Sequence, residues 1–325
     1  GGCPHILAEP MRTNLVTYSS DFSQWLIYDT ITRTANYGTS PDGTQNSFKI
    51  GSSGASNDFM YLSLSLSASQ SYSLSFFIKN VDSVESKFFT PSESTTTITW
   101  SGSGITSISD GTYESFGNGW YKITSAATSQ SDGGYISRFY PSTSGTASVE
   151  LYGYQLEVGS YPTSLIPTSG STVTRNQDIF TRDGIGSLIN SEEGVLFVEM
   201  AALSDDSTDR VMSLSDGTNN HRILLAYTST TNQIQAFHND NVSPVNLVFT
   251  VSDVTDFHKV AFKYKVNDFA LWVDGVEVAT NNTKGVNMAN TLNELKFENA
   301  SGSSDFFGKV KQLQVYDTAL TDTQL

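Results

Sequence analysis

The sequence predicts an all-β protein built of two antiparallel β-sandwich (jelly-roll) domains in tandem. Its 325 residues are too many for one ordinary domain and suit two domains of roughly 150 residues each. Aromatic residues make up 12% of the chain, and Ser, Thr, Gly, Asn and Asp are abundant, a balance that favours strands joined by many turns. Apolar residues alternate with other residues in short runs, which is the period of a strand and not of a helix.

The first domain is expected over residues 14–165. In YSLSFFIK every second residue is apolar, so one strand face carries Tyr72, Leu74, Phe76 and Ile78. The runs WYKITSAAT, GYISRFYPS and SVELYGYQLE repeat this pattern. Turn-forming residues separate the runs, with clusters at 40–44, 51–58, 101–104, 109–112 and 117–119. Several short strands at near-regular spacing predict an antiparallel sandwich.

The second domain is expected over residues 188–325. Its clearest element is DFALWVDGVEVA, in which two alternating apolar runs flank Asp274 and Gly275. Both of these residues tolerate positive φ, so the segment predicts a tight β-hairpin. FHKVAFKYK before it and FFGKVKQLQVY after it indicate further strands.

The boundaries follow from where the alternation stops. YGYQLE at 152–157 is expected to close the first sandwich, with Tyr152, Tyr154 and Leu156 on one face. Prolines follow it, and because proline has no N–H to donate to a strand ladder, the domain should end there. Residues 166–187 carry few periodic positions and are expected to be a linker. Residues 1–13 are expected to be a junction to an upstream part of a longer polypeptide.

The charge of the chain disfavours two classes of partner. It holds 18 basic and 33 acidic residues, for a net charge of −15, which repels nucleic-acid phosphates and anionic membranes. It has no run of 18 apolar residues, so no membrane insertion is expected. The single cysteine, Cys3, allows no intrachain disulfide. The acidic excess fits a solvated surface or the binding of divalent cations.

Catalytic patterns are absent, so we expect the chain not to be an enzyme. Its four histidines show no HExxH spacing, and no G-x-S-x-G elbow is present. Glycosidases hold two carboxylates across the scissile bond. Glu199 lies on a predicted strand, but Phe197 and Ala201 flank it on its own face instead of carboxylates.

Sugar rings present apolar C–H faces and hydroxyl groups, so sugar sites combine an exposed aromatic ring with amide, carboxylate or guanidinium groups. The candidates with these side chains are Trp25, Tyr61, Trp100, Arg138 and Tyr140 in the first domain and Arg222 in the second. Trp100 stands beside the SGSG loop, where an exposed ring would be useful. The alternative for each aromatic is a place in the core, which is the interpretation that we favour for Trp120.

Oxygen-bearing side chains also suggest a structural Ca²⁺, which selects oxygen ligands. Asp216 and Asn219 lie in the turn of SDGTNNHRILL, and Asp21 and Glu157 could share a second site. The spacing does not match an EF-hand loop. Turn formation by Asp and Asn is the alternative explanation.

The second domain is similar to the concanavalin A-like, laminin-G-like family of β-sandwich lectin domains. The similarity lies in the early strand GVLFVEMAAL, the hairpin FHKVAFKYKVNDFALWVDGVEVA and the terminal FFGKVKQLQVYDTALTDTQL. The resemblance implies a lectin-like sandwich. Such modules often hold a structural Ca²⁺, which adds to the expectation of calcium.

The first domain resembles jelly-roll modules of bacteriophage tail fibres and other virion-surface proteins, which look like carbohydrate-binding modules. The matching segments are CPHILAEPMRTNLVTYSSDFSQW, ANYGTSPDGTQNSFKI, GNGWYKIT and YGYQLEVGSYPTSLIPTSGSTVTRNQD. The leading CPHILAEP looks like the junction that joins such modules to an upstream virion-anchoring part.

Together the resemblances imply host attachment, that is, non-catalytic recognition of a host cell-surface polysaccharide by a virion tail fibre or spike. Weak single sites would gain avidity in a homo-oligomer such as a trimer, and other virion proteins would be partners. Two other functions stay open: a structural or assembly module of the virion surface, and a glycan-degrading enzyme or its appended binding module. The expected location is the virion surface, with a secreted extracellular protein as the alternative.

Overall fold

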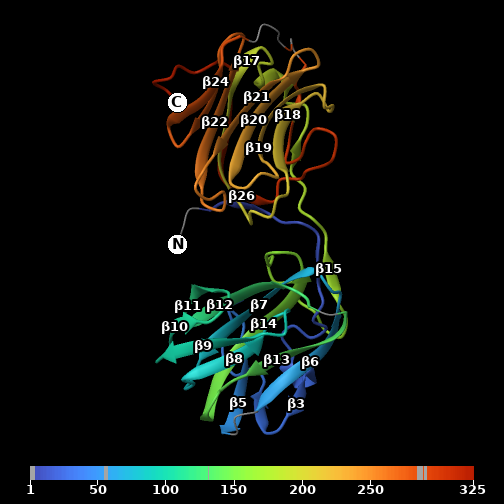
Figure 1. Cartoon of the computed structure of the whole chain (residues 1–325), viewed down its shortest axis with the longest axis vertical. Coiled ribbons are helices and arrows are strands. Elements are labelled where there is room, and N and C mark those ends of the chain that lie inside the picture. The colour runs from blue at the N-terminus through green and yellow to red at the C-terminus, as the bar shows by residue number, and fades with distance from the viewer. Residues whose placement is uncertain (1–3, 55–57, 131, 284–287, 289–290) are drawn as a thin grey trace. The chain divides into compact units, whose positions relative to one another are not determined.

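Figure 1 shows the computed structural model, which describes residues 4–54, 58–130, 132–283, 288 and 291–325. The strands within each sheet pair antiparallel in this part of the chain. Its helical elements are two short 3-10 turns, η1 (Phe22–Gln24) and η2 (Gly186–Leu188). The predicted all-β class with two antiparallel sandwiches is therefore confirmed. Among the described residues, no helix has the length and apolar character needed to cross a membrane.

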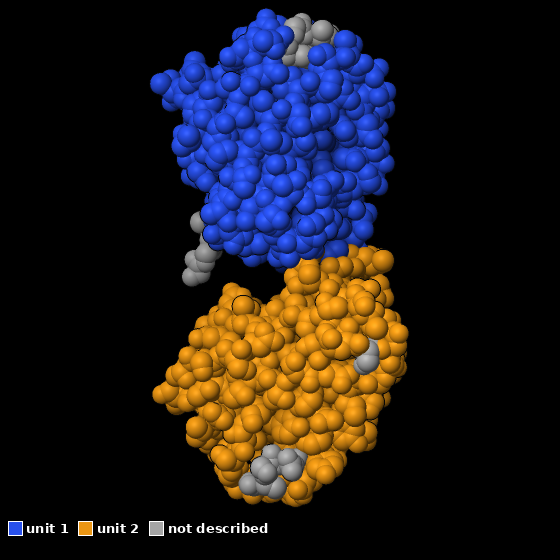
Figure 2. Space-filling model, in the orientation of Figure 1, with its two compact units in different colours: residues 1–10, 177–325 blue, residues 11–176 orange. Residues whose placement is uncertain are grey.

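The chain forms two compact units, which Figure 2 shows in different colours. The amino-terminal sandwich comprises residues 11–176. The carboxy-terminal sandwich comprises residues 177–325 together with the start of the chain up to residue 10. Cys3 lies outside the described residues.

The segments expected to be a junction and a linker contain short strands that pair within the sandwiches. Within 1–13, β1 (Ile6–Ala8) pairs with β26 (Gly308–Tyr316) of the carboxy-terminal sandwich. Within 166–187, β15 (Val173–Arg175) pairs with β2 (Arg12–Asn14) of the amino-terminal sandwich. In the same segment, β16 (Thr181–Arg182) pairs with β25 (Glu294–Lys296). These strands have two or three residues each, too few to show an alternating pattern in the sequence.

Two six-stranded sheets form the amino-terminal sandwich. The first, sheet I, has the order β10 (Gly104–Ile108), β9 (Thr95–Ser101), β8 (Glu85–Phe89), β13 (Gly133–Tyr140), β6 (Phe59–Leu66) and β3 (Leu26–Tyr28). The second, sheet II, has the order β11 (Thr112–Gly117), β12 (Trp120–Thr128), β7 (Ser71–Asn80), β14 (Gly145–Val158), β5 (Phe48–Gly54) and β4 (Ile31–Thr34).

The carboxy-terminal sandwich also has two six-stranded sheets. Sheet III has the order β1, β26, β17 (Glu193–Ala202), β22 (His258–Lys265), β23 (Phe269–Val273) and β24 (Val276–Asn281). Sheet IV has the order β16, β25, β18 (Arg210–Ser215), β19 (His221–Tyr227), β20 (Gln233–Asp240) and β21 (Val245–Thr250).

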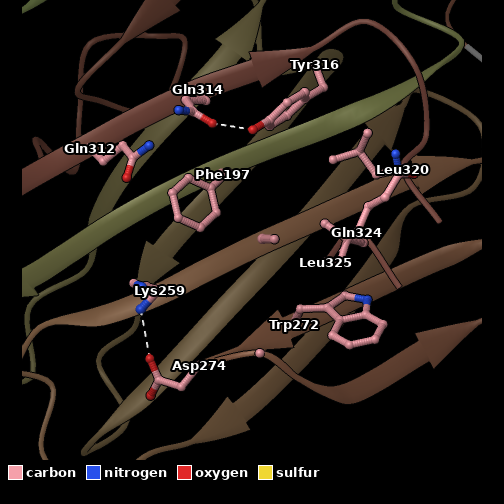
Figure 3. Close-up of a pocket in the computed structure, with 12 residues that line it drawn as sticks. Phe197, Lys259, Trp272, Asp274, Gln312, Gln314, Tyr316, Leu320, Gln324 and Leu325 are labelled. Atoms are coloured by element: carbon pink, nitrogen blue, oxygen red, sulfur yellow. Dashed lines mark hydrogen bonds between the residues drawn. The ribbon is translucent and has the colours of Figure 1, made fainter. Parts of the chain in front are cut away.

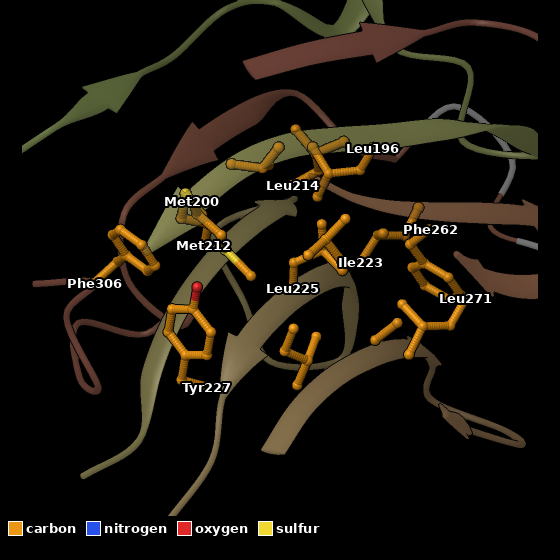
Figure 4. Close-up of a cluster of buried hydrophobic side chains, with 14 of the residues drawn as sticks. Leu196, Met200, Met212, Leu214, Ile223, Leu225, Tyr227, Phe262, Leu271 and Phe306 are labelled. Carbon is orange, nitrogen blue, oxygen red and sulfur yellow. The ribbon is translucent and has the colours of Figure 1, made fainter. Parts of the chain in front are cut away.

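The alternating residues build the cores, as their pattern predicted. The even-numbered apolar residues of β7 are buried in the core of the amino-terminal sandwich: Tyr72, Leu74, Phe76 and Ile78. In the carboxy-terminal sandwich, side chains of sheets III and IV meet in one cluster, where Leu196 and Phe262 of sheet III pack with Leu214 and Ile223 of sheet IV (Figure 4). Burial of apolar area at about 25 cal/mol per Å² makes these clusters the main stabilising contribution in each sandwich.

The Asp-Gly hairpin is also confirmed. Asp274 and Gly275 join β23 to β24 with φ of 52° and 79°. Two successive positive φ angles give the turn a twist that matches the twist of the flanking strands.

One prediction about the faces of β14 is wrong. Tyr154 and Leu156 lie in the sandwich core, but Tyr152 packs on the opposite face of sheet II with Phe77 and Trp120. The register shifts between Tyr152 and Gln155, where β14 has one residue more than β7. Such a bulge changes the face on which the following side chains point.

Candidate functional site

One face of sheet I carries large side chains that do not enter the core. Alternate residues of a strand point to opposite faces of a sheet. In β13, Tyr135 and Phe139 are buried in the core, so Ile136, Arg138 and Tyr140 lie on the outer face. In β6, Met60 is likewise buried, which places its neighbours Phe59 and Tyr61 on the outer face.

The strand register gathers these outer residues. Arg138 lies opposite Tyr61, and Tyr61 lies opposite Leu26 of the edge strand β3. On that same strand, Tyr28 lies opposite Phe59. The result is an open hollow of about 460 Å³, here called the aromatic groove, lined by Tyr28, Phe59, Tyr61, Ile136, Arg138 and Tyr140.

Ring contacts hold the groove in shape. The rings of Tyr28 and Phe59 stack with centroids 4.8 Å apart and planes 9° apart. Tyr140 contacts Phe59 at 4.9 Å and Phe89 at 6.2 Å between centroids. Such pairs each contribute about 0.5–1.5 kcal/mol beyond their buried area. The groove is therefore a set of mutually supported rings, and not a set of separate exposed side chains.

Polar atoms at the groove remain available to a ligand. No described residue forms a hydrogen bond with the hydroxyl of Tyr28, Tyr61 or Tyr140. The side chain of Tyr28 is also exposed, at 54%. A tyrosine hydroxyl both donates and accepts hydrogen bonds. The groove thus combines apolar ring faces with free hydroxyl groups, which is the pairing that a sugar ring requires.

Arg138 lies between two rings of this surface. Its guanidinium carbon is 5.2 Å from the centroid of Phe59 and 4.7 Å from that of Phe89. These distances are within the range of cation–π attraction. The Nε atom of Arg138 is buried and has no hydrogen-bond partner in the described part of the chain.

The structure brings together three of the predicted ligand-binding residues: Tyr61, Arg138 and Tyr140. Sequence reasoning missed Tyr28, Phe59 and Ile136. Phe59 could have been found, because it has the same parity as Tyr61 in one run. Tyr28 could not, because a strand of three residues shows no pattern.

Two predicted ligand-binding tryptophans are core residues instead. Trp25 is 2% exposed, and its Nε1 donates to the carbonyl oxygen of Tyr18 at 3.1 Å. Trp100 is 5% exposed, and its Nε1 donates to Ser86 Oγ at 3.2 Å. Trp100 has the same parity in β9 as the buried Ile98, so it points inward although a loop follows it. Trp120 is buried as expected, at 2% exposure, but in the small cluster with Phe77 and Tyr152 on the outer face of sheet II.

A second hollow lies on the outer face of sheet III (Figure 3). Its floor is one cross-strand row, in which Gln314, Phe197, Ala261 and Trp272 lie side by side. The small side chain of Ala261 stands between the two aromatic side chains and leaves the space. We call this hollow, of about 410 Å³, the Trp272 groove; Gln312, Tyr316, Lys259, Asp274 and Leu320 also contribute to its lining.

Asp274 is the acidic residue of the Trp272 groove, and it has partners within the chain. Its carboxylate accepts hydrogen bonds from the backbone N–H of Lys259 at 2.9 Å and from His258 Nδ1 at 2.7 Å. Burial alone would raise the pKa of Asp274, but these hydrogen bonds outweigh it and lower the pKa. Asp274 is therefore a carboxylate and a hydrogen-bond acceptor at neutral pH, which does not fit the role of a general acid.

The end of the chain borders this groove through an ion-pair cluster. Lys263 is buried, and its Nζ is 2.8 Å from Asp268 and 2.9 Å from Asp322. Burial would lower the pKa of Lys263, but the hydrogen bonds to the two carboxylates raise it. The cluster holds the segment that carries the groove residues Leu320, Gln324 and Leu325.

The predicted Arg222 lies on a separate part of sheet IV. Its guanidinium donates to Asn219 Oδ1 and lies 5.5 Å from the ring of Phe237. Burial lowers the pKa of Arg222. The hollow beside it measures about 180 Å³, less than half of either groove.

The four predicted metal ligands have hydrogen-bond partners within the chain. Glu157 is fully buried and accepts from Thr163 and Gln155, whereas Asp21 caps η1 through Ser23. Asp216 bonds His221 and Thr218, and Asn219 bonds Ser301. Among the residues that the structure describes, no group of three or more His, Cys, Asp or Glu side chains is placed to hold a metal ion. Calcium binding stays a prediction.

Residues 196–325 match the family model described as "Concanavalin A-like lectin/glucanases superfamily". This match covers the carboxy-terminal sandwich from β17 onward and agrees with the family resemblance of its sequence motifs. A search of curated proteins found no match to the chain.

Several solved structures are distantly similar. A carbohydrate-binding module (CBM40) of a Ruminococcus gnavus sialidase, bound to sialyllactose, has 15% identity and a TM-score of 0.38 over 45% of this chain and 96% of that chain. A leech intramolecular trans-sialidase has 17% identity and a TM-score of 0.36 over 42% of this chain and 23% of that chain. Domains LG4-5 of the mouse laminin α1 chain have 11% identity and a TM-score of 0.32 over 80% of this chain and 88% of that chain. Similarity at this level carries no information about the ligand.

Proposed function

We propose that the chain is a non-catalytic carbohydrate-binding protein whose main site is the aromatic groove. One observation carries the proposal: stacked rings, free tyrosine hydroxyls and a guanidinium line one open hollow of about 460 Å³. The ring faces match the apolar C–H faces of a sugar, and the hydroxyls match its hydroxyl groups. Ring contacts position the groove before a ligand arrives, which reduces the entropy cost of binding.

The groove residues support binding and not hydrolysis. Glycoside hydrolysis requires two carboxyl groups about 5–10 Å apart across the scissile bond. No Asp or Glu is among the described residues that line the aromatic groove. The Trp272 groove has a single carboxylate, Asp274, in its described lining. Neither hollow therefore presents the pair that hydrolysis needs.

The Trp272 groove is the second site of the proposal. It combines Trp272 and Phe197 with the amide groups of Gln312 and Gln314, and an aromatic ring beside amides suits a sugar. It belongs to the part of the chain that matches the lectin superfamily model. Two weak sites in one chain, multiplied in an oligomer, would supply avidity without any strong single contact.

We place this binding in host attachment by a virion tail fibre or spike, with a cell-surface polysaccharide as partner. The sequence motifs of the amino-terminal sandwich support this context. An assembly role on the virion surface, through contact with other virion proteins or with further copies of the chain, is the second candidate. The exposed Leu26, Tyr28 and Ile136 favour it, because a contiguous apolar patch also suits a protein interface.

The test compares two exposed tyrosines of the same sandwich. Tyr28→Ala removes a ring from the aromatic groove, whereas Tyr113→Ala removes a ring of similar exposure from sheet II. We expect Tyr28→Ala to weaken glycan binding about two- to tenfold, because stacking of a ring contributes about 0.5–1.5 kcal/mol. Tyr113→Ala should bind like the wild type. Titration calorimetry with glycans selected on an array, and adsorption to cells, are the measurements.

The outcome also separates the two candidate functions. If folded wild-type protein binds no glycan on the array and does not adsorb to cells, carbohydrate recognition is wrong. If Tyr28→Ala instead dissociates an oligomer in analytical ultracentrifugation and leaves glycan binding unchanged, the groove is an assembly surface.

A further inference from the structure

We propose that the aromatic groove selects sugars that carry a carboxylate, and that Arg138 is the specificity-determining residue. This inference rests on the proposed carbohydrate binding and names the chemical class of the ligand. A uronic acid unit and a sialic acid-type unit share this chemistry.

Arg138 carries a charge that no described carboxylate pairs with. No ion pair or hydrogen bond joins its guanidinium to another side chain or carbonyl in the described part of the chain. Other arginines differ: Arg33 donates to the carbonyl oxygens of Phe22 and Trp25, and Arg210 pairs with Asp206. A charged group without an internal partner, placed in a groove, is free to bind a ligand.

Arg138 is nevertheless held in place by aromatic rings. Phe59 and Phe89 lie 5.2 Å and 4.7 Å from its guanidinium carbon, and its Nε is buried. The planar guanidinium is therefore restrained before a ligand binds. A fixed, planar set of N–H donors matches the two oxygens of a carboxylate. Phe59, one of the two rings that hold Arg138, also belongs to the lining of the aromatic groove.

The aromatic groove differs in charge from the chain as a whole. The chain has a net charge of −15, so its overall field disfavours an acidic ligand, and acceptance of one requires a local positive charge. The aromatic groove has this charge, because Arg138 is present and its described lining includes no Asp or Glu. Lys87 adds a second cation next to it, opposite Tyr140 in the strand register. The nearby Glu85 accepts a hydrogen bond from Thr143 at 2.9 Å.

The experiment uses two pairs of glycans that differ in the carboxylate. The first pair is a glucuronate-containing oligosaccharide and its carboxyl-reduced form. The second pair is sialyllactose and lactose. We expect the wild type to bind the acidic member of at least one pair about tenfold more tightly than the neutral member, because hydrogen bonds between two charged groups are stronger than those between neutral groups. The pair that shows the preference identifies the source of the carboxylate.

Arg138→Gln should abolish this preference, since the amide keeps a donor but loses the charge. Arg138→Lys should retain part of it, because an ammonium is a point charge without the planar fork. The exposed Arg182→Gln, in the other sandwich, is the control and should leave the preference unchanged. If Arg138→Gln shows no thermal unfolding transition, the variant is not folded, and the salt dependence of wild-type binding is measured in place of the variant. The preference should then fall as salt rises to 1 M, where the screening length is about 3 Å.

Equal binding of acidic and neutral members by the wild type would overturn the inference, as would an unchanged preference in folded Arg138→Gln. In both cases carbohydrate binding itself would stand. Absence of binding to every glycan, neutral ones included, would overturn the proposed function.

Discussion

Asp58 shows how one buried carboxylate supports the aromatic groove. It is fully buried and directly precedes Phe59 in the chain. Its oxygens accept hydrogen bonds from Ser52 Oγ at 2.8 Å, from the N–H of Ser53 at 2.9 Å and from the N–H of Thr30 at 3.3 Å. Burial would raise the pKa of Asp58, but these donors outweigh it and lower the pKa. The carboxylate thus ties the start of β6 to its neighbours.

Asp58→Asn should destabilise the amino-terminal sandwich by about 1–3 kcal/mol at pH 7, because buried donors lose a charged acceptor. The folded pKa lies below the unfolded value of about 3.9. The stabilising effect is therefore present above about pH 4 and is lost as the pH falls through the folded pKa. Urea unfolding at pH 7 and pH 3 should show a smaller difference between the variant and the wild type at pH 3. The exposed Asp110→Asn is the control, and equal pH dependence in wild type and Asp58→Asn would contradict the prediction.

Single aromatic residues were hard to interpret from the sequence. Tyr61 and Tyr140 belong to the groove, whereas Trp25 and Trp100 are buried. A flanking loop suggested that Trp100 is exposed, but its parity with Ile98 decides its face. Alternation was thus more informative than position next to a loop, because a strand points its side chains by parity up to its last residue.

At the scale of elements, β14 is the strand whose pattern misleads. Gly153 has φ of 63° and lies in the bulge between Tyr152 and Gln155. A Cβ at this position would lie 2.8 Å from Leu165 Cδ2 and 3.2 Å from Phe77 Cδ2. Glycine is therefore required twice here, by the backbone conformation and by the close approach. The bulge turns Tyr152 away from the core that Tyr154 and Leu156 enter.

Gly153→Ala should cost about 2 kcal/mol, since a left-handed conformation alone costs about 1–2 kcal/mol for an L-residue and the methyl group would also displace Leu165. Gly134→Ala is a matched control in the same sandwich, because Gly134 lacks a positive φ and open space surrounds the position that a Cβ would take there. The control should change stability by less than about 0.5 kcal/mol. Equilibrium unfolding in denaturant measures both, and equal effects would refute the role assigned to the bulge.

At the scale of the whole molecule, the chain crosses between its two units near both ends of the amino-terminal sandwich. β2 and β15 pair with each other and close that sandwich. β1 pairs with β26 and adds an edge strand to sheet III. Ala8 of β1 is buried in the core of the carboxy-terminal sandwich. The amino-terminal sandwich is therefore an insertion between the first strand of the other sandwich and the rest of it.

Removal of residues 1–10 should consequently destabilise the carboxy-terminal sandwich, which is distant in sequence, and not the amino-terminal one, which follows directly in the chain. The expected loss is about 1–3 kcal/mol, from the burial of Ala8 and the hydrogen bonds of β1. Differential scanning calorimetry should show one shifted transition and one unchanged transition. A separately expressed fragment of residues 11–176 should unfold at the temperature of the unchanged transition, which assigns that transition to the amino-terminal sandwich. A shift of the amino-terminal transition instead would contradict the assignment of β1.

The sequence by itself determined the class of the fold, the Asp274–Gly275 hairpin and the alternating core faces, because these depend on local periodicity and turn chemistry. Only the tertiary structure decided which outer residues meet. Tyr28, Phe59, Tyr61 and Arg138 lie on three strands, and their register rests on pairing between distant parts of the chain. It also decided that β1 joins the carboxy-terminal sandwich. A strand of three residues is too short to show an alternating pattern in the sequence. Alternation in a longer strand predicts its two faces, but it does not predict which strands are its neighbours in the sheet.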